Sequence, residues 1–316
     1  MKTISIVVPC YNEEENVEAL YVEIKNIFKE FLSAYKYEII YIDNDSKDRT
    51  RDIIRTLCMK DKGVKAIFNA RNFGQFNSPY YALINSGGDA TILIAADFQD
   101  PPLMILKFVK AWEEGYKIAI GIKSSSREAA IMYHLRGLYY KLIKKLSDVE
   151  QIEHFTGFGL YDKAFIEVLR KLDDPTPFLR GIVAELGFKR CEIEYEQPKR
   201  RAGMTSNNLY SLYDAAMLSV TSYTKFGLRM ATFIGGFCSL VSMLIAITYL
   251  ILKLIYWDRF PAGMAPMLIG MLLLGSIQIF FIGIIGEYIL SISQRVMRRP
   301  LVIEEERINW ETDKEV

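Results

Sequence analysis

The sequence predicts an α/β protein built on a mainly parallel sheet, followed by two helices that cross a membrane. The first prediction rests on apolar, β-rich runs that alternate with helical patterns through the first half of the chain. The second rests on two long stretches without a charged side chain, Met230 to Leu252 and Phe260 to Gly286. Each exceeds the roughly 20 residues that span about 30 Å of hydrocarbon.

The elements of the first half are expected in strict alternation. The strands are "ISIVVP", "YEIIYID", "VKAIFN", "ATILIAAD" and "YKIAIGI", and three helices lie near residues 13–31, 47–59 and 75–85. The fourth strand should end at Asp97, because an apolar, β-rich run is typical of a strand buried on both faces. A fourth helix should begin at Pro101, since Asp100 followed by two prolines is typical of an N-cap and first turn.

Composition narrows the possible functions. The chain has 316 residues and a formal net charge of only +1, so bulk charge indicates no nucleic-acid partner. The N-terminal apolar run is too short for a signal peptide, and we expect the first half to stay in the cytoplasm. The absence of Gly-x-Gly-x-x-Gly and Walker motifs after the first strand argues against dinucleotide-binding and P-loop enzymes.

Basic residues flank the two apolar stretches on one side. They are Lys225, Arg229, Arg295, Arg298 and Arg299. Because positive charge is retained on the cytoplasmic side, the two spans should form a hairpin in the plasma membrane with both chain ends in the cytoplasm. We therefore expect a cytoplasmic catalytic domain at 1–208, an amphipathic juxtamembrane helix at 209–228, two membrane helices at 229–290 and a cytoplasmic tail at 291–316.

Two amphipathic segments are candidates for the membrane interface. Residues 129–149 place apolar side chains at alternating spacings of four and three, with basic residues on the other faces. Residues 209–228 lead directly into the first span. Such helices can lie among lipid headgroups, and the alternative for each is packing against the sheet.

Polar clusters follow three of the predicted strands: "VVPCYNEEEN", "IDNDSKDRT" and "AADFQDPP". Because parallel strands end at one edge of a sheet, where open α/β sheets bind ligands, the three clusters should converge. Together with "RNFGQ", "GFGLYDK" and "PKRRAGMTS", they resemble the family-2 inverting glycosyltransferases of the GT-A fold. With the two spans and the trailing "RRPLVIEEERINW", the chain is similar to polyprenyl-phosphate glycosyltransferases, close to the bactoprenol glucosyltransferase group.

The resemblance implies a reaction and its participants. One sugar would pass, with inversion, from a nucleotide sugar to undecaprenyl or another polyprenyl phosphate at the cytoplasmic membrane face. A UDP-linked donor such as UDP-glucose is expected, while the residues themselves leave the sugar and the base open. The resemblance also implies Mg²⁺ or Mn²⁺ as cofactor and a homo-oligomer, since relatives include tetramers.

The resemblance also assigns residues to the donor. Asp97 matches the second aspartate of the family's DxD motif and Gln99 the glutamine beyond it, so both are the expected metal-binding residues. The cation would bridge Asp97 and the diphosphate and neutralise the leaving group. The alternative is that Asp97 and Asp100 only cap a turn. The positions that match the family's nucleotide-binding residues are Pro9, Tyr11, Glu13 and Asp43, of which Asp43 would accept an N–H of the base.

Arginines are the expected ligands of the acceptor phosphate. A lipid phosphate has a second pKa of about 6 and is largely dianionic at pH 7, so it needs cationic positioning more than a general base. Arg200 and Arg127 are expected in the catalytic site, and Arg71, Arg136 and Arg201 in substrate binding, because guanidinium groups bind phosphate oxygens bidentately. For each arginine the alternative is a solvated surface charge.

The sequence departs from the family's pattern at three positions. The first aspartate of DxD is Ala95, the second aspartate of the family's D-D-G-S is Asn44, and an aspartate that serves some relatives as general base falls at Gly157. Of these, Ala95 and Gly157 motivate an alternative function, a membrane-anchored nucleotide-sugar-binding protein that has lost catalysis. A processive polysaccharide synthase is the third hypothesis, and the lack of a QxxRW signature argues against it.

Overall fold

The computed structural model describes residues 1–125, 152–198, 200–201, 217–218, 221, 226–256 and 264–310. The chain divides into two compact units. One comprises Met1–Tyr140, Val149–Asn208 and Met297–Val316, and the other Lys141–Asp148 and Leu209–Val296. The amphipathic segments expected at 129–149 and 209–228 lie almost wholly outside the described residues.

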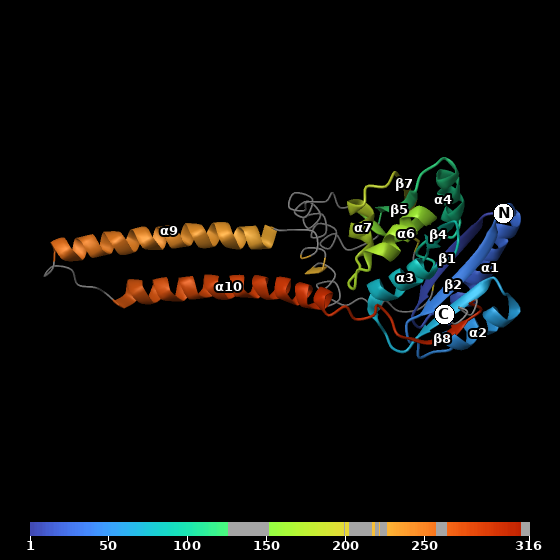
Figure 1. Cartoon of the computed structure of the whole chain (residues 1–316), viewed down its shortest axis with the longest axis horizontal. Coiled ribbons are helices and arrows are strands. Elements are labelled where there is room, and N and C mark those ends of the chain that lie inside the picture. The colour runs from blue at the N-terminus through green and yellow to red at the C-terminus, as the bar shows by residue number, and fades with distance from the viewer. Residues whose placement is uncertain are drawn as a thin grey trace. The chain divides into compact units, whose positions relative to one another are not determined.

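A mixed sheet of eight strands, in the order β7-β5-β6-β4-β1-β2-β3-β8, forms the centre of the described part of the first unit. Figure 1 shows this sheet with the helices that pack on it. Six strands run in one direction, and β6 and β8 run against them. The predicted α/β fold with a mainly parallel sheet is thus confirmed. The strands are β1 (Thr3–Cys10), β2 (Lys36–Asp43), β3 (Val64–Asn69), β4 (Ala90–Leu93), β5 (Ile118–Ser125), β6 (Phe155–Asp162), β7 (Arg190–Glu196) and β8 (Glu304–Ile308).

Helices cover both faces of this sheet. Successive strand residues point to opposite faces, so Ile6 and Val8 of β1 enter one buried cluster and Val7 enters the other. The first cluster takes apolar side chains from α1, α2 and α4, and the second from α3, α6 and α7. The helices are α1 (Val17–Glu30), α2 (Thr50–Lys60), α3 (Gly74–Asn85), α4 (Met104–Glu113), α6 (Lys163–Leu172) and α7 (Leu179–Glu185).

Two predicted boundaries around "AADFQDPP" are wrong for one physical reason. The carboxylate of Asp100 accepts the N–H of Ala95 at 3.1 Å and the hydroxyl of Tyr195 at 3.0 Å. Because Ala95 bonds to Asp100 instead of a neighbouring strand, β4 ends at Leu93, before Asp97. Because Asp100 is held there, it does not cap a helix, and α4 begins at Met104 rather than Pro101.

The C-terminal segment adds a strand that the sequence did not predict. β8 pairs antiparallel with β3, with Glu306 opposite Phe68. Asn309 Nδ2 donates to the carbonyls of Cys58 (2.7 Å) and Val64 (2.8 Å), and Trp310 Nε1 donates to that of Ala66 (3.1 Å). The strand therefore closes an edge of the sheet that would otherwise present unpaired backbone groups.

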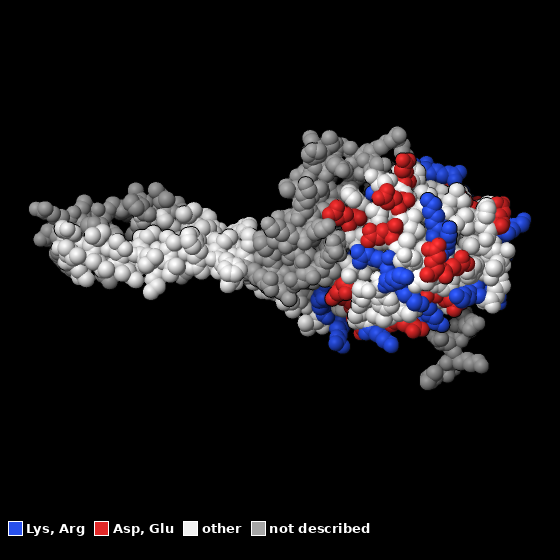
Figure 2. Space-filling model, turned by 90° about the horizontal axis from the view of Figure 1, so that it is seen from above, with Lys and Arg blue, Asp and Glu red and all other residues white. Residues whose placement is uncertain are grey.

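The second unit contains two long helices, α9 (Phe226–Ile255) and α10 (Met264–Val296), which contact each other. Their described surface is mostly apolar: Phe233 is 76% exposed and Ile279 73%, and Figure 2 shows lysine, arginine and acidic side chains gathered on the first unit. By length and composition, one stretch of the described residues, Leu273–Val296, suffices to cross a membrane. Thr232–Ile245 of α9 is a shorter apolar stretch.

Candidate functional site

The loops after β1 and β2 are locked together at one edge of the sheet. The backbone N–H of Asn12 donates to Ser46 Oγ at 2.9 Å, and that of Glu13 donates to Thr50 Oγ1 at 2.8 Å. In return, Asn12 Oδ1 accepts the N–H of Lys47 at 2.8 Å. The convergence predicted for these two clusters is observed, because parallel strands bring their carboxyl ends to the same edge.

Each of the three site loops carries one non-glycine residue in the left-handed conformation. They are Asn12 (φ 55°), Asp45 (φ 69°) and Phe98 (φ 61°). Asn and Asp tolerate this region, whereas a bulky residue such as Phe98 is strained there. Such backbone persists only where the surroundings hold it, and it gathers at ligand sites.

A cluster of charged residues joins the loops after β1 and β4. Arg200 Nη2 lies 2.9 Å from Glu13 Oε1, and Arg200 Nε lies 3.0 Å from Asp97 Oδ2. Both carboxylates are buried. Burial raises the pKa of Glu13, although a hydrogen bond from Asn16 and the charge of Arg200 act in the opposite direction. The structure thus brings three of the predicted site residues into one ion-paired group.

Asp43 ends β2 in a separate, fully buried position. Its Oδ2 accepts the N–H of Ser46 at 3.1 Å and the Nε–H of Arg51 at 2.7 Å. Its Oδ1 has no hydrogen-bond partner among the described residues. A buried carboxylate oxygen is costly to leave unpaired, so this atom is suited to accept an N–H from a ligand.

Asn44 holds the loop after β3 in place. Its Nδ2 donates to Asn72 Oδ1 (2.9 Å) and to the carbonyl of Gly74 (3.2 Å). Its Oδ1 accepts from Asn69 Nδ2 (3.0 Å) and from the N–H of Phe73 (2.8 Å). The amide therefore uses donors and acceptors together, which a carboxylate cannot do.

The other predicted site residues that the structure describes lie at the same edge. Gln99 donates its backbone N–H to Asp97 Oδ1 at 3.1 Å. The guanidinium of Arg71 lies over the ring of Phe73, and that of Arg201 over Phe98. Pro9 is half-buried in β1, and Tyr11 is exposed just beyond it. Arg127 and Arg136 lie outside the described residues.

The donor set at Asp97 fits a hard divalent cation with few protein ligands. No group of three or more His, Cys, Asp or Glu that could hold a metal occurs among the described residues. Asp97 and Glu13 nevertheless supply buried carboxylate oxygens on facing loops, joined through Arg200. Mg²⁺ commonly takes only one or two protein carboxylates beside phosphate oxygens and water.

Gly157 occupies a position that disfavours a side chain. Its φ is +105°, a conformation that L-residues rarely adopt, and a Cβ there would lie 3.5 Å from Leu93 Cδ2. Its carbonyl accepts the hydroxyl of Tyr161 at 2.6 Å. An aspartate at this point of β6 would therefore be strained in the present backbone.

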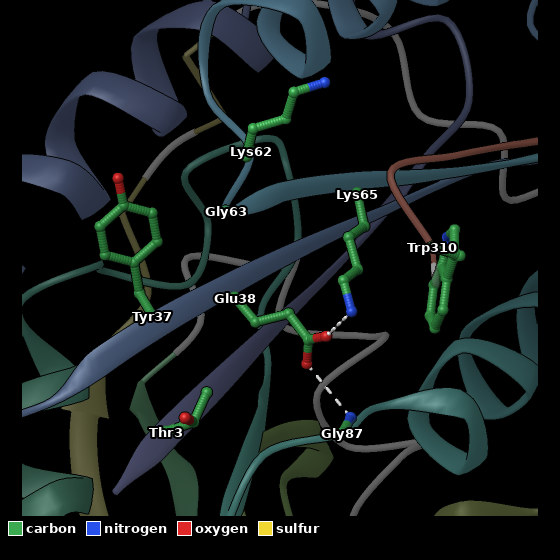
Figure 3. A pocket seen from close by; sticks show the side chains of 8 residues that line it. All are labelled: Thr3, Tyr37, Glu38, Lys62, Gly63, Lys65, Gly87 and Trp310. Atoms are coloured by element: carbon green, nitrogen blue, oxygen red, sulfur yellow. Dashed lines mark hydrogen bonds and ion pairs between the residues drawn. The ribbon is translucent and has the colours of Figure 1, made fainter. Parts of the chain in front are cut away.

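A shallow pocket of about 440 Å³ lies at the opposite edge of the sheet, where β1, β2 and β3 begin (Figure 3). Lys65 Nζ points to Glu38 Oε1 at 2.5 Å, and Gly87 donates its N–H to Glu38 Oε2 at 3.1 Å. The buried carboxylate is thus already paired. None of the predicted site residues lines this pocket, which makes it a poor candidate for the chemistry.

Reasoning from sequence missed Arg51, the hydrogen bonds by which Asn44 holds the next loop, and the loop-locking hydroxyls of Ser46 and Thr50. All four residues lie within or next to the quoted "IDNDSKDRT", so the motif located the region. Nothing in it distinguishes Arg51 from Arg49, because the contacts of Arg51 depend on the turn between β2 and α2.

Comparison with known proteins decides the family. The model for glycosyl transferase family 2 matches residues 5–169. This chain belongs to glycosyl transferase family 2. The bactoprenol glucosyl transferase of Shigella phage SfX is 32% identical over 298 residues, which are 94% of this chain and 97% of that protein. An uncharacterized glycosyltransferase, YkcC of Bacillus subtilis, is 31% identical over 300 residues, 95% of this chain and 92% of that protein.

Two solved structures are also similar. Glucosyl-3-phosphoglycerate synthase from Mycobacterium tuberculosis, in complex with Mn²⁺, UDP and phosphoglyceric acid, is 20% identical, with 70% of this chain and 76% of that chain covered and a TM-score of 0.46. Mannosyl-3-phosphoglycerate synthase from Rubrobacter xylanophilus is 17% identical, with 70% and 72% covered and a TM-score of 0.49. The predicted resemblance to family 2 is confirmed by the family match and the curated relatives.

Proposed function

We propose that this glycosyltransferase moves one sugar, with inversion, from a nucleotide-sugar donor to a polyprenyl phosphate at the cytoplasmic membrane face. The observation that carries the proposal is the meeting of Glu13, Asp97 and Arg200 at the carboxyl edge of the sheet, where Asp43 ends the neighbouring strand β2. Relatives named bactoprenol glucosyl transferase, at 32% identity over nearly the whole chain, support the lipid acceptor.

The donor would lie across the ends of β1, β2 and β4. Asp43 Oδ1 would accept an N–H of the base, and a UDP-linked sugar is the expected donor. Asp97, with Gln99 beside it, would hold Mg²⁺ or Mn²⁺. When bound, the cation would neutralise charge on the departing nucleoside diphosphate.

Arg200 would position the acceptor phosphate. Its guanidinium lies against two buried carboxylates, which would hold it beside the proposed donor site. A guanidinium can bind phosphate oxygens bidentately, and a dianionic phosphate can attack without losing a proton. Gly157 in place of an aspartate is therefore compatible with catalysis.

The membrane part would hold the enzyme at the lipid surface. Leu273–Val296 is the candidate span, and the apolar surface of α9 supports a second one. Both chain ends would face the cytoplasm, with the enzyme in the plasma membrane and assembled as a homo-oligomer.

The test uses the purified full-length protein, undecaprenyl phosphate and a panel of labelled nucleotide sugars. We expect one glycosylated lipid product, lost in excess chelator and reduced at least about a hundredfold by Asp97→Asn. Asp89→Asn is the matched control, because Asp89 accepts the N–H of Thr3 at the opposite edge of the sheet. Nucleotide binding without any lipid-dependent turnover would favour the non-catalytic alternative, and normal turnover by Asp97→Asn would refute the metal assignment.

A further inference from the structure

Among the described residues, Arg51 is the positively charged side chain that pairs with Asp43. Three separate parts of the first unit hold the Arg51 guanidinium. Its Nε donates to Asp43 Oδ2 at 2.7 Å. Its Nη2 donates to the carbonyl of Asn69, at the end of β3, at 2.7 Å. Its Nη1 donates to Glu305 Oε2, in β8, at 2.8 Å. The guanidinium thus has its orientation fixed by contacts on all three nitrogens.

The two donors to Asp43 meet on the same oxygen. Both Arg51 and the N–H of Ser46 bond Oδ2, and Oδ1 keeps its full acceptor capacity. Two donors on one carboxylate oxygen set the plane of the group as well as its position. Arg51 and the N–H of Ser46 therefore orient the Asp43 carboxylate together.

The surroundings of Arg51 keep its guanidinium positively charged and hold it in place. Burial lowers the pKa of Arg51, but hydrogen bonds to Asp43 and Glu305 outweigh that effect and raise it. The guanidinium also lies 5.6 Å from the centre of the Phe68 ring, within the range of a cation–π contact. A fixed, permanently charged partner is what a positioning role requires.

β8 offers an internal comparison. Glu305 bonds Arg51, and its neighbour Glu306 bonds Arg55 Nη2 at 2.8 Å. Arg55 lies one helical turn beyond Arg51 and also covers Phe68, at 4.8 Å from the ring centre. The two ion pairs join the same helix to the same strand, but only that of Arg51 continues to Asp43.

We propose that Arg51 is a positioning residue for recognition of the nucleotide base, that it acts through Asp43, and that Glu305 of the C-terminal strand holds it in place. The inference rests on the proposed function, because it requires Asp43 to accept an N–H of the base. It makes the segment that follows α10 a part of the donor site.

The experiment measures nucleotide binding to the full-length protein by calorimetry. Whichever of UDP and GDP binds more tightly is compared with its analogue methylated at the ring N–H, N3-methyl-UDP or N1-methyl-GDP. The ratio of the two dissociation constants reports how the protein recognises the ring N–H of the base. A variant that merely loosens the fold weakens both ligands and leaves the ratio unchanged. In the wild type we expect a ratio of about 10 or more.

Four variants separate positioning from stability. Arg51→Gln should bring the ratio close to about 1, whereas Arg55→Gln should leave it at the wild-type value. Glu305→Gln should lower the ratio about twofold to fivefold, and Glu306→Gln should not change it. Thermal unfolding checks that each variant is folded. If Arg51→Gln does not fold, the comparison of the ratio in Glu305→Gln with that in Glu306→Gln tests the positioning role instead.

The outcomes are distinct. If the wild type binds neither nucleotide, or binds the methylated analogue equally well, the donor assignment of the proposed function fails and the inference falls with it. If the wild type discriminates and the folded Arg51→Gln protein keeps the ratio, the proposed function stands and the positioning role is wrong. Equal effects of Glu305→Gln and Glu306→Gln would refute the role of the strand.

Discussion

Asn44 shows how one residue can depart from a family pattern for a structural reason. The family's second aspartate at this point would be an acceptor only, whereas Asn44 donates two hydrogen bonds and accepts two. The residue links the ends of β2 and β3 to the loop that carries Arg71. The amide of Asn44 thus holds the loop after β3 in place, which a carboxylate at this position could not do.

Asn44→Asp should therefore destabilise the protein, although it restores the family's residue. Two donated bonds are lost, and the new carboxylate faces the carbonyl oxygens of Asn72 and Gly74, so we expect a loss of about 2–3 kcal/mol. Chemical denaturation measures this. The control is Asn72→Asp, which adds the same charge in the same loop but keeps both bonds accepted by Oδ1, and should cost less than about 0.5 kcal/mol. Equal losses for the two variants would contradict the interpretation.

The carboxylates of the site and their partner Arg200 could be predicted from the sequence, whereas Arg51 and Asn44 could not. Glu13, Asp43 and Asp97 follow parallel strands, and parallel strands end at one edge whatever the loops do. Arg51 and Asn44 act through bonds that depend on the exact path of loops, and the Glu305 partner of Arg51 comes from the far end of the chain. No local pattern encodes a contact of that separation.

Among the elements, five strands with apolar runs were predicted, whereas the buried strand β6 and the charged strands β7 and β8 were missed. β1 to β5 are buried on both faces, so their composition is β-rich and apolar. β7 has the sequence "RCEIEYE" and β8 has "EEERI", because strands near a sheet edge carry charges toward solvent. The acidic side chains of β8 pair with Arg51 and Arg55 of α2, a contact between distant parts of the chain.

Asp61, at the end of α2, ties three elements together and makes their packing dependent on pH. Burial alone would raise the pKa of Asp61, but hydrogen bonds from Tyr37 in β2, the N–H of Gly63, and Tyr21 and Lys25 in α1 lower it to about 2. A carboxyl with a depressed pKa stabilises the fold above its unfolded value, near 3.8, and loses this contribution as pH falls toward 2.

Asp61→Asn should therefore cost about 2 kcal/mol at pH 7, and the difference from wild type should narrow between pH 4 and pH 3. Denaturation of both proteins at pH 7, 4 and 3 measures the difference. Asp52→Asn in the same helix is the control, since the Asp52 side chain is mostly exposed and its pair with Arg55 is long, at 3.4 Å. A difference that stayed constant with pH would show that the loss does not come from the charge.

For the whole molecule, the sheet restricts how the chain can cross a membrane. β3 and β8 are paired in one sheet, and α9 and α10 lie between them in the sequence. A single crossing would leave the two strands on opposite sides of the bilayer. If Leu273–Val296 spans the membrane, a second crossing must precede it, and α9, with 30 residues, has a length of about 45 Å.

We therefore expect a helical hairpin with residues 257–263 outside the cell and both ends of the chain in the cytoplasm. Single cysteines introduced by Lys171→Cys, Asp258→Cys and Ile303→Cys in a cysteine-free background are treated with a membrane-impermeant thiol reagent. Asp258→Cys should react in intact cells, and the other two, at exposed positions of the first unit, only after permeabilisation. Reaction of Ile303→Cys but not Lys171→Cys in intact cells would mean a single crossing and would require β8 to leave the sheet. Reaction of none before permeabilisation would leave α9 and α10 on the cytoplasmic side, where their apolar surface must find another partner.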